Sequence, residues 1–342
     1  MGKRETGLDI LRCMALFFVN GVHCFLYNGF YSQPQVGGAM WMANCLRWLF
    51  YGCIGIFLML TGYLKSQKPL NRQYFWSLVP VLLGYFLTCA ISFPIRHFLL
   101  DDPLTLAEWV EKLFTFGNYA WYVEMYIGLI LVSPAINLAL GQLKTKKELL
   151  WAAGILFCVT ALPSITKENW IPDYWKALYP FTYYVIGAVI RRLRPKMKLW
   201  TGLLLTVVWV GILGMVSLLA TDEGFSKGFT QGYGGFWVTV MVTLIFLTFY
   251  RVQLKPKAAK IAAWMAGGCF EGYLLSRLFD VWVYGEVKQW HVPEKYPLIL
   301  LCVTVPVFLG SVLMGKGTHA LAELILKPFR KAAPAKTGKK AK

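Results

Sequence analysis

Ten long runs of apolar residues follow one another along the chain, separated by short polar segments. A helix needs about 20 predominantly apolar residues, with a range of roughly 17 to 25, to cross a bilayer. The pattern therefore predicts an all-α polytopic membrane protein with about ten transmembrane helices. The runs cover residues 9–29, 40–64, 74–95, 119–140, 149–163, 177–190, 199–220, 232–250, 261–283 and 296–314, of which the fifth and sixth are the shortest.

The connecting segments alternate in charge. The N-terminus, the C-terminal tail and every second connection (65–73, 141–148, 191–198 and 251–260) hold 25 of the 35 Lys and Arg residues but only three acids. By the positive-inside rule, this alternation predicts an even number of spans with both termini in the cytoplasm. We expect a single transmembrane domain over residues 1–315 and a basic cytoplasmic tail over 316–342 that is partly disordered.

Composition excludes several classes of protein. Hydrophobic residues make up 57% of the chain and charged residues 15%, whereas a typical soluble domain has about 25% charged residues. The alternation between connections accounts for the net charge of +18, so we expect the lipid bilayer, and no nucleic acid, as the partner of the basic residues. None of the eight cysteines forms a C-x-x-C pair, so the sequence predicts no metal site.

The first apolar run carries a stripe of polar residues. Arg12 and His23 are 11 residues apart, which on a helix is nearly three full turns and roughly 16 Å. Asp9 and Asn20 have the same spacing and fall on the same face. Ionisable groups within a bilayer are costly and mark functional sites. The stripe therefore predicts a site with Arg12 on the cytoplasmic side and His23 in the outer half.

Four more ionisable residues lie in the outer halves of predicted spans: Arg47, Glu124, Arg277 and Asp280. Together with the outer end of the stripe, they predict a polar cavity that opens outward. Arg277 and Asp280 are three residues apart, so a purely structural ion pair is the alternative for these two.

Three aromatic residues begin the fourth run: Trp121, Tyr122 and Tyr126. They are candidates for a sugar-stacking wall in the cavity. Aromatic residues are also enriched at membrane interfaces, and anchoring there is the alternative role. His97 and His319 lie outside the predicted spans, and we expect both to be solvated.

At this point the order of the motifs resembles that of the integral-membrane acyltransferase 3 family. The R-X10-H pair of that family matches Arg12 and His23 within GLDILRCMALFFVNGVH. Four later segments, GIFLMLTGYL, WYVEMYIGLILVSPAIN, YPFTYYVIGAVIRR and GCFEGYLLSRLFD, resemble later family helices in the same order. There are two departures. Only Arg72 remains of an R-x-x-R pair, and Ser276 stands where many members have a second histidine.

The resemblance implies a membrane O-acyltransferase that moves an acyl group, usually acetyl, from a cytoplasmic acyl-CoA to a hydroxyl of a cell-surface or lipid-linked glycan. The subgroup resembled decorates bacterial surface glycans, which implies a multi-pass protein of the bacterial cytoplasmic (inner) membrane. Acetyl-CoA is then a donor substrate, and no permanently bound cofactor is expected. The sequence carries no signal for an oligomeric state.

The resemblance also implies roles for the stripe. Arg12 would hold a donor phosphate, and His23 would act as general base or as transient acyl carrier. Asp9 and Asn20 would orient Arg12 and His23. Two other classes stay open at this stage. One is a transporter or flippase for a lipid-linked or anionic substrate, and the other is a noncatalytic membrane assembly subunit.

Overall fold

The structure is a computed structural model that describes residues 4–100, 105–116, 120–165, 171–219, 232–287 and 296–331, and no strand occurs in these ranges. The first half contains α1 (Thr6–Tyr27), η1 (Phe30–Ser32), α2 (Gly37–Tyr51), α3 (Cys53–Lys65), α4 (Arg72–Trp76), α5 (Val79–Leu99), α6 (Leu106–Phe114), α7 (Trp121–Gln142), α8 (Lys146–Thr160) and η2 (Leu162–Ser164). The second half contains η3 (Asp173–Leu178), α9 (Tyr179–Leu193), α10 (Leu199–Leu219), α11 (Phe236–Phe249), α12 (Pro256–Ala266), α13 (Cys269–Leu275), α14 (Arg277–Val287) and α15 (Tyr296–Lys331). The predicted all-α class is confirmed for these residues.

The number of long apolar helices differs from the predicted number of about ten spans. Among the described residues, seven helices are long and apolar enough to cross a membrane. The predicted spans 177–190 and 232–250 correspond to α9 and α11, which have 15 and 14 residues. The predicted span 261–283 is broken into α12, α13 and α14. Half or more of the residues of α9, α11 and α13 are buried by neighbouring helices, so these elements do not need the length that a lipid-facing span requires.

The last helix is longer than its apolar run predicts. The run ends at residue 314, but α15 continues to Lys331. The sequence THALAELILK in this extension is rich in Ala, Leu and other strong helix formers. The first part of the predicted tail is therefore helical, and residues 332–342 lie outside the described residues.

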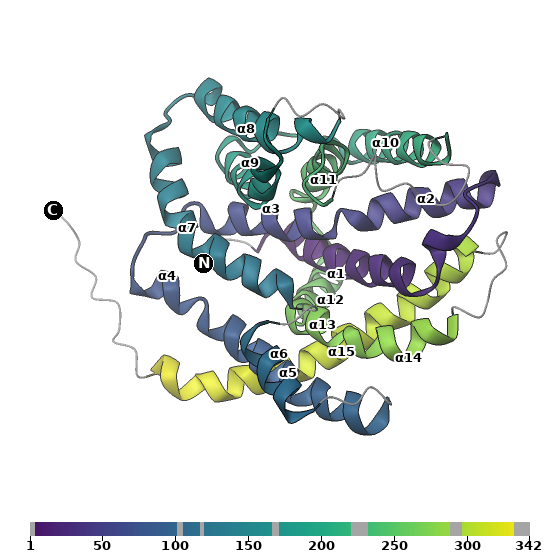
Figure 1. Cartoon of the computed structure of the whole chain (residues 1–342). Coiled ribbons are helices and arrows are strands. Elements are labelled where there is room, and N and C mark those ends of the chain that lie inside the picture. Colours follow the sequence, from purple (N-terminus) through teal and green to yellow (C-terminus); the bar gives the residue numbers. More distant parts are fainter. Residues whose placement is uncertain are drawn as a thin grey trace.

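α1 lies in the middle of the bundle. In Figure 1 it runs between α2 and α3 on one side and α13, α14 and α15 on the other, and it packs against each of these helices. The largest hydrophobic cluster of the protein contains residues from all five of these helices and from α1 itself, including Leu11, Leu16 and Phe25 of α1, which are fully buried. The polar stripe of α1 is therefore held inside the bundle.

The break between α12 and α13 positions the inner end of α13 against α15. The chain turns at Gly267 and Gly268, and a Cβ atom on Gly268 would lie 2.8 Å from the backbone nitrogen of Lys316. A Cβ atom on Gly315 would lie 2.2 Å from the carbonyl oxygen of Gly268. A side chain on either glycine would therefore separate the two helices. This contact places Glu271 of α13 opposite the extension of α15.

Five of the six basic segments meet at one end of the bundle, which we call the N-terminal end, where Arg191 donates to Gln67 of the segment 65–73 at 3.4 Å. Glu5 pairs with Arg194 at 2.7 Å, and this hydrogen bond raises the pKa of the Arg194 guanidinium. Arg251 donates to the carbonyl of Arg194 at 3.0 Å, and Arg192 donates to the carbonyl of Leu143 at 2.9 Å. Segments that the charge alternation assigns to one side of the membrane are therefore joined to one another.

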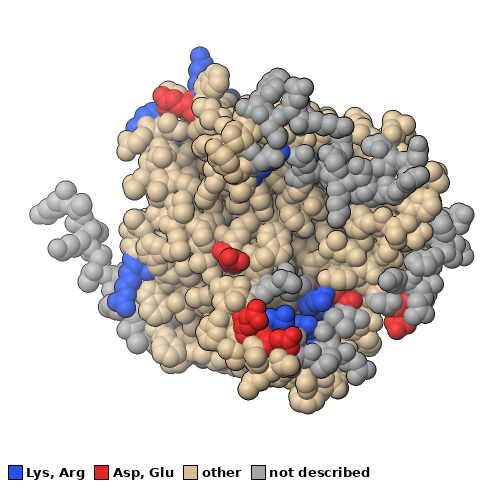
Figure 2. Space-filling model, viewed as in Figure 1, with Lys and Arg blue, Asp and Glu red and all other residues tan. Residues whose placement is uncertain are grey.

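The outer surface of the bundle is largely apolar. Figure 2 shows one face, on which charged side chains gather in a few groups and leave broad uncharged areas between them. Exposed apolar side chains run the length of α10, for example Trp200, Leu204, Val207 and Leu219. A soluble monomer seldom exposes so continuous an apolar surface, whereas a lipid-facing helix requires it.

The contact between α3 and α9 gives a first prediction. A Cβ atom on Gly62 would lie 1.9 Å from the carbonyl oxygen of Tyr184, and one on Gly187 would lie 2.2 Å from that of Met59. Gly62→Val should therefore push the helices apart and destabilise the protein by about 1–3 kcal/mol or more. Thermal unfolding in detergent measures the effect, with Gly154→Val as the control because nothing lies within 4 Å of that Cβ position. Equal melting temperatures for the two variants would contradict the close packing.

Candidate active site

The polar stripe lies on one unbroken helix, because α1 continues without interruption from Thr6 to Tyr27. Arg12 and His23 therefore share a face of α1 at a separation of roughly 16 Å along its axis. Asp9 and Asn20 lie on the same face. The stripe thus connects the N-terminal end of the bundle with the far end, where Arg277 and Asp280 lie.

Asp9 is the centre of the stripe's cationic end. It is buried, with 1% of its surface exposed. Arg4 binds it with Nε at 2.6 Å and Nη2 at 2.9 Å, and Arg12 donates to it from Nη1 at 2.8 Å. The hydrogen bond to Asp9 raises the pKa of Arg4. Asp9 therefore orients Arg12, as expected, and it also orients Arg4, which the sequence interpretation missed although Arg4 lies only five residues away.

His23 pairs with a carboxylate from the other end of the chain. Its Nδ1 lies 3.1 Å from Oδ2 of Asp280, which is 3% exposed. Arg277 Nη1 lies 3.8 Å from the same oxygen and donates to the hydroxyl of Tyr27 at 2.6 Å. We predicted Asp280 as a substrate-binding residue. The structure buries its carboxylate against the histidine, a position from which it can orient the imidazole.

Asn20 is completely buried between these two ends. Its backbone carbonyl accepts a hydrogen bond from Tyr284 at 2.8 Å. Its side-chain oxygen and nitrogen have no hydrogen-bond partner among the described residues, so the expected orienting bond from Asn20 to His23 is not formed. A buried amide without a partner is costly, and a water molecule or a polar substrate atom would satisfy it.

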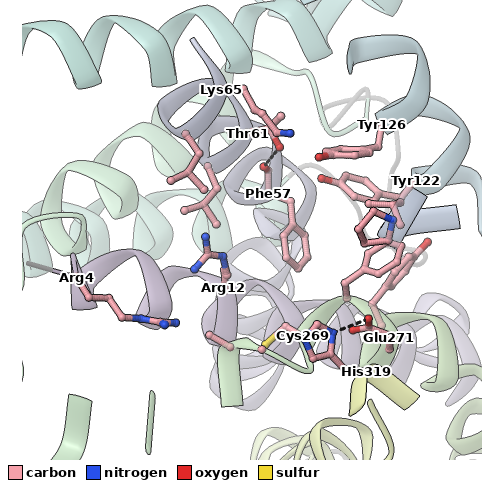
Figure 3. A pocket seen from close by; sticks show the side chains of 18 residues that line it. Arg4, Arg12, Phe57, Thr61, Lys65, Tyr122, Tyr126, Cys269, Glu271 and His319 are labelled. Carbon is pink, nitrogen blue, oxygen red and sulfur yellow. Dashed lines mark hydrogen bonds and ion pairs between the residues drawn. The ribbon is translucent and has the colours of Figure 1, made fainter. Parts of the chain in front are cut away.

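A cavity of about 410 Å³ opens beside Arg12. Figure 3 shows Arg12 reaching into it from α1, with Lys65 and Thr61 on one wall and Tyr122 and Tyr126 on another. A second cavity of about 550 Å³ shares Arg4, Arg12 and Leu64 with the first and adds Glu5, Arg191 and Arg194. The apolar pocket therefore continues into an arginine-lined space at the N-terminal end.

The first cavity holds a pair that the sequence interpretation missed. His319 Nδ1 lies 2.9 Å from Oε1 of Glu271, and both residues line the cavity (Figure 3). We expected His319 to be solvated because the apolar run ends at residue 314. The extension of α15 instead carries it back against α13. No role was assigned to Glu271, although a carboxylate within an apolar run is itself a signal of a buried partner.

The aromatic candidates separate into two groups. Tyr122 and Tyr126 line the cavity beside Arg12, so they are not part of a wall around His23. Trp121 stacks on Tyr233 with ring centres 5.7 Å apart, and Tyr233 stacks on Tyr51 at 4.3 Å. Trp121 therefore belongs to this aromatic stack, and its ring centre also lies 6.5 Å from that of Tyr122.

The remaining two predicted residues also separate. Arg47 lies over the ring of Tyr51 at 4.4 Å and thus caps the aromatic stack that contains Trp121. Arg47 is 4% exposed. Glu124 is exposed in the first turn of α7 and lines neither of the two cavities. Among the described residues, His23, Arg277 and Asp280 lie together, whereas Arg47 lies in the aromatic stack and Glu124 is exposed.

These groups define what the site can do chemically. A carboxylate against Nδ1 of an imidazole favours the tautomer with the proton on Nδ1, which places the basic lone pair on Nε2. The arginines at the other end of α1 are suited to phosphate or carboxylate groups. Among the described residues, no group of three His, Cys, Asp or Glu side chains is placed to hold a metal ion.

A bundle of long apolar helices with paired ionisable groups in its interior is the architecture of a multi-pass membrane protein. A family model described as an acyltransferase domain matches residues 5–316. The chain therefore belongs to the acyltransferase 3 family, and this membership indicates membrane acyltransferase activity. Comparisons with curated proteins and with solved structures gave no match.

The contact between His23 and Asp280 gives a second prediction. Asp280→Asn removes the charge that orients the imidazole while it keeps the shape of the side chain. We expect kcat for acyl transfer to fall by about 10²- to 10⁴-fold, the contribution typical of a positioned general base, with little change in melting temperature. Glu286→Gln is the matched control, because Glu286 is exposed on the same helix. An Asp280→Asn protein with full activity would show that the pair is only structural.

Proposed function

We propose that the protein is a membrane O-acyltransferase that moves an acetyl group from a cytoplasmic acyl-CoA to a hydroxyl of a cell-surface or lipid-linked glycan. One observation carries the proposal. The unbroken helix α1 holds a cavity-lining arginine toward one end and a histidine paired with a buried carboxylate toward the other. An acyl donor with an anionic head and a long arm fits such a path.

The donor enters, in this proposal, from the N-terminal end. The basic segments joined at that end support its assignment to the cytoplasm by the positive-inside rule. Acyl-CoA is a cytoplasmic anion, and Arg4, Arg12, Arg191 and Arg194 surround the space through which it would pass. Arginine binds phosphate oxygens in a bidentate manner. The apolar cavity beyond Arg12 would receive the arm of the donor.

His23 supplies the chemistry. As general base, it takes the proton of the acceptor hydroxyl while the hydroxyl oxygen attacks the thioester carbonyl. The new C–O bond forms, the C–S bond breaks, and the proton passes from the imidazolium to the departing CoA thiolate. Asp280 stabilises the imidazolium that forms in between. As acyl carrier, His23 would attack the thioester carbonyl and expel the CoA thiolate. The acceptor hydroxyl would then attack the acyl-imidazole, the C–N bond would break, and the hydroxyl proton would pass to the released imidazole.

The acceptor would approach from the far end of the bundle. In the stack of Trp121, Tyr233 and Tyr51, neighbouring rings and Arg47 cover the faces of the two tyrosines, so we assign contact with a sugar ring to Trp121, at the end of the stack. Glu124 stays a predicted acceptor contact, and its side chain is exposed at the start of α7.

The family and the charge pattern support a place in the bacterial cytoplasmic (inner) membrane. Family membership favours acyl transfer over transport or a noncatalytic role.

The proposal predicts that His23→Ala abolishes ester transfer while the protein still accumulates in the membrane. His97→Ala in α5 is the control, since His97 contacts Phe98 and Trp109 and lies outside the proposed machinery. The readout is the mass of the surface glycan, which should lose an acetyl ester when the gene is deleted or His23 is replaced.

Two outcomes would contradict the proposal. Full activity of His23→Ala would remove His23 from the site. Unchanged glycan mass after deletion, with a lipid-linked precursor accumulating inside the cell, would favour transport. Mass spectrometry of the enzyme trapped with labelled acetyl-CoA separates the two histidine roles, because only an acyl carrier yields acyl-His23.

A further inference from the structure

Lys65 differs from the four arginines that line the two cavities at the N-terminal end of the bundle. It lies in the last turn of α3 and is 9% exposed. Arg4 and Arg12 share the carboxylate of Asp9, and Arg191 and Arg194 share that of Glu5. Lys65 has no carboxylate within ion-pair distance among the described residues. Its ammonium group donates to the hydroxyl of Ser77 and lies 5.4 Å from the centre of the Tyr74 ring.

A buried ammonium group without an anion is costly, because a neutral hydroxyl replaces only part of its hydration. Lys65 is nevertheless retained at a position that lines the 410 Å³ cavity together with Arg4 and Arg12. In Figure 3, Arg12 and Lys65 reach this cavity from different walls, and Tyr122 and Tyr126 line it beside them. Asp9 and the cavity-lining Glu271, which is paired with His319, compensate two of the three positive charges, so one positive charge remains when His319 is neutral. The cavity therefore has the charge of a site for an anionic ligand.

We infer that Lys65 binds a phosphate group of the acyl-CoA donor across the cavity from Arg12. This inference rests on the proposed function, because it names a further donor contact of the same site. The ligand it requires carries at least one phosphate on a long, otherwise weakly charged arm. The pyrophosphate and the phosphate on the ribose of CoA share this chemistry, and donors that lack one or both of them distinguish between the two.

The experiment measures the Kd of acetyl-CoA for the purified full-length protein in detergent by isothermal titration calorimetry, which needs no acceptor. Lys65→Met should raise this Kd at least tenfold, which corresponds to about 1.4 kcal/mol. Lys65→Arg should stay close to the wild type, because it keeps the charge. Lys68→Met is the matched control, because Lys68 is exposed three residues further on. Acetyl-pantetheine, which has no phosphate, should bind the wild type and Lys65→Met equally.

Acetyl-dephospho-CoA identifies the phosphate involved. If Lys65→Met still weakens binding of this donor, Lys65 contacts the pyrophosphate, and if the penalty disappears, it contacts the ribose phosphate. Equal Kd values of acetyl-CoA for the wild type and Lys65→Met would overturn the inference. An equal penalty with acetyl-pantetheine would do the same, because Lys65 would then act without a phosphate.

Binding of acetyl-CoA to the wild type and the melting temperature of Lys65→Met show whether the role of Lys65 or the proposed donor is wrong. If the wild type binds no acetyl-CoA, the proposed donor is wrong and both proposals fall, whereas wild-type binding with an unaffected Lys65→Met overturns only the role of Lys65. Lys65 also lies where the C-terminal dipole of α3 favours a cation. A purely structural role predicts a lower melting temperature for Lys65→Met and an unchanged Kd. Lys65→Gln provides the same Kd test if the methionine variant does not fold.

Discussion

The interior of this bundle depends on one constraint, which is that a carboxylate inside an apolar protein must have a cationic or hydrogen-bonding partner. Three buried carboxylates satisfy this constraint with different partners. Asp9 pairs with two arginines, Asp280 pairs with a histidine and has an arginine nearby, and Glu271 pairs with His319. The pairs of Asp280 and Glu271 join α1 to α14 and α15 to α13, whereas the pairs of Asp9 are local to the start of α1. The same contacts orient the side chains to which we assign chemistry, so folding and function use one set of interactions.

The sequence was informative where the relevant residues lie on one helix. Arg12 and His23 were predicted to share a face because the helical repeat alone decides this, and α1 is unbroken. The pairing of His23 with Asp280 spans 257 positions of the chain and depends on how α14 packs against α1. No periodicity within either segment contains that information.

Two other differences have local physical causes. The run 261–283 is predominantly apolar, but Gly267, Gly268 and the turn at Ser276 divide it into three short helices. The apolar run at 296–314 ends where lipid contact would end, yet the helix continues because the following residues are strong helix formers. His319 therefore reaches Glu271, a contact that hydropathy could not predict. Hydropathy reports which residues avoid water, whereas glycine contacts and helix propensity decide where a helix stops.

The continuity of α1 has a consequence for the choice of donor. A straight, unbroken helix packed on most sides does not stretch, so the roughly 16 Å between its arginine and its histidine is a fixed length. In the proposed reaction, this fixed distance sets the length that a donor must have between its anionic head and its reactive carbon. A thioester whose reactive carbon lies too close to its anionic head cannot be held by Arg12 and reach His23 at once. Selection among activated acyl compounds would then depend on reach, separately from any recognition of the acyl group itself.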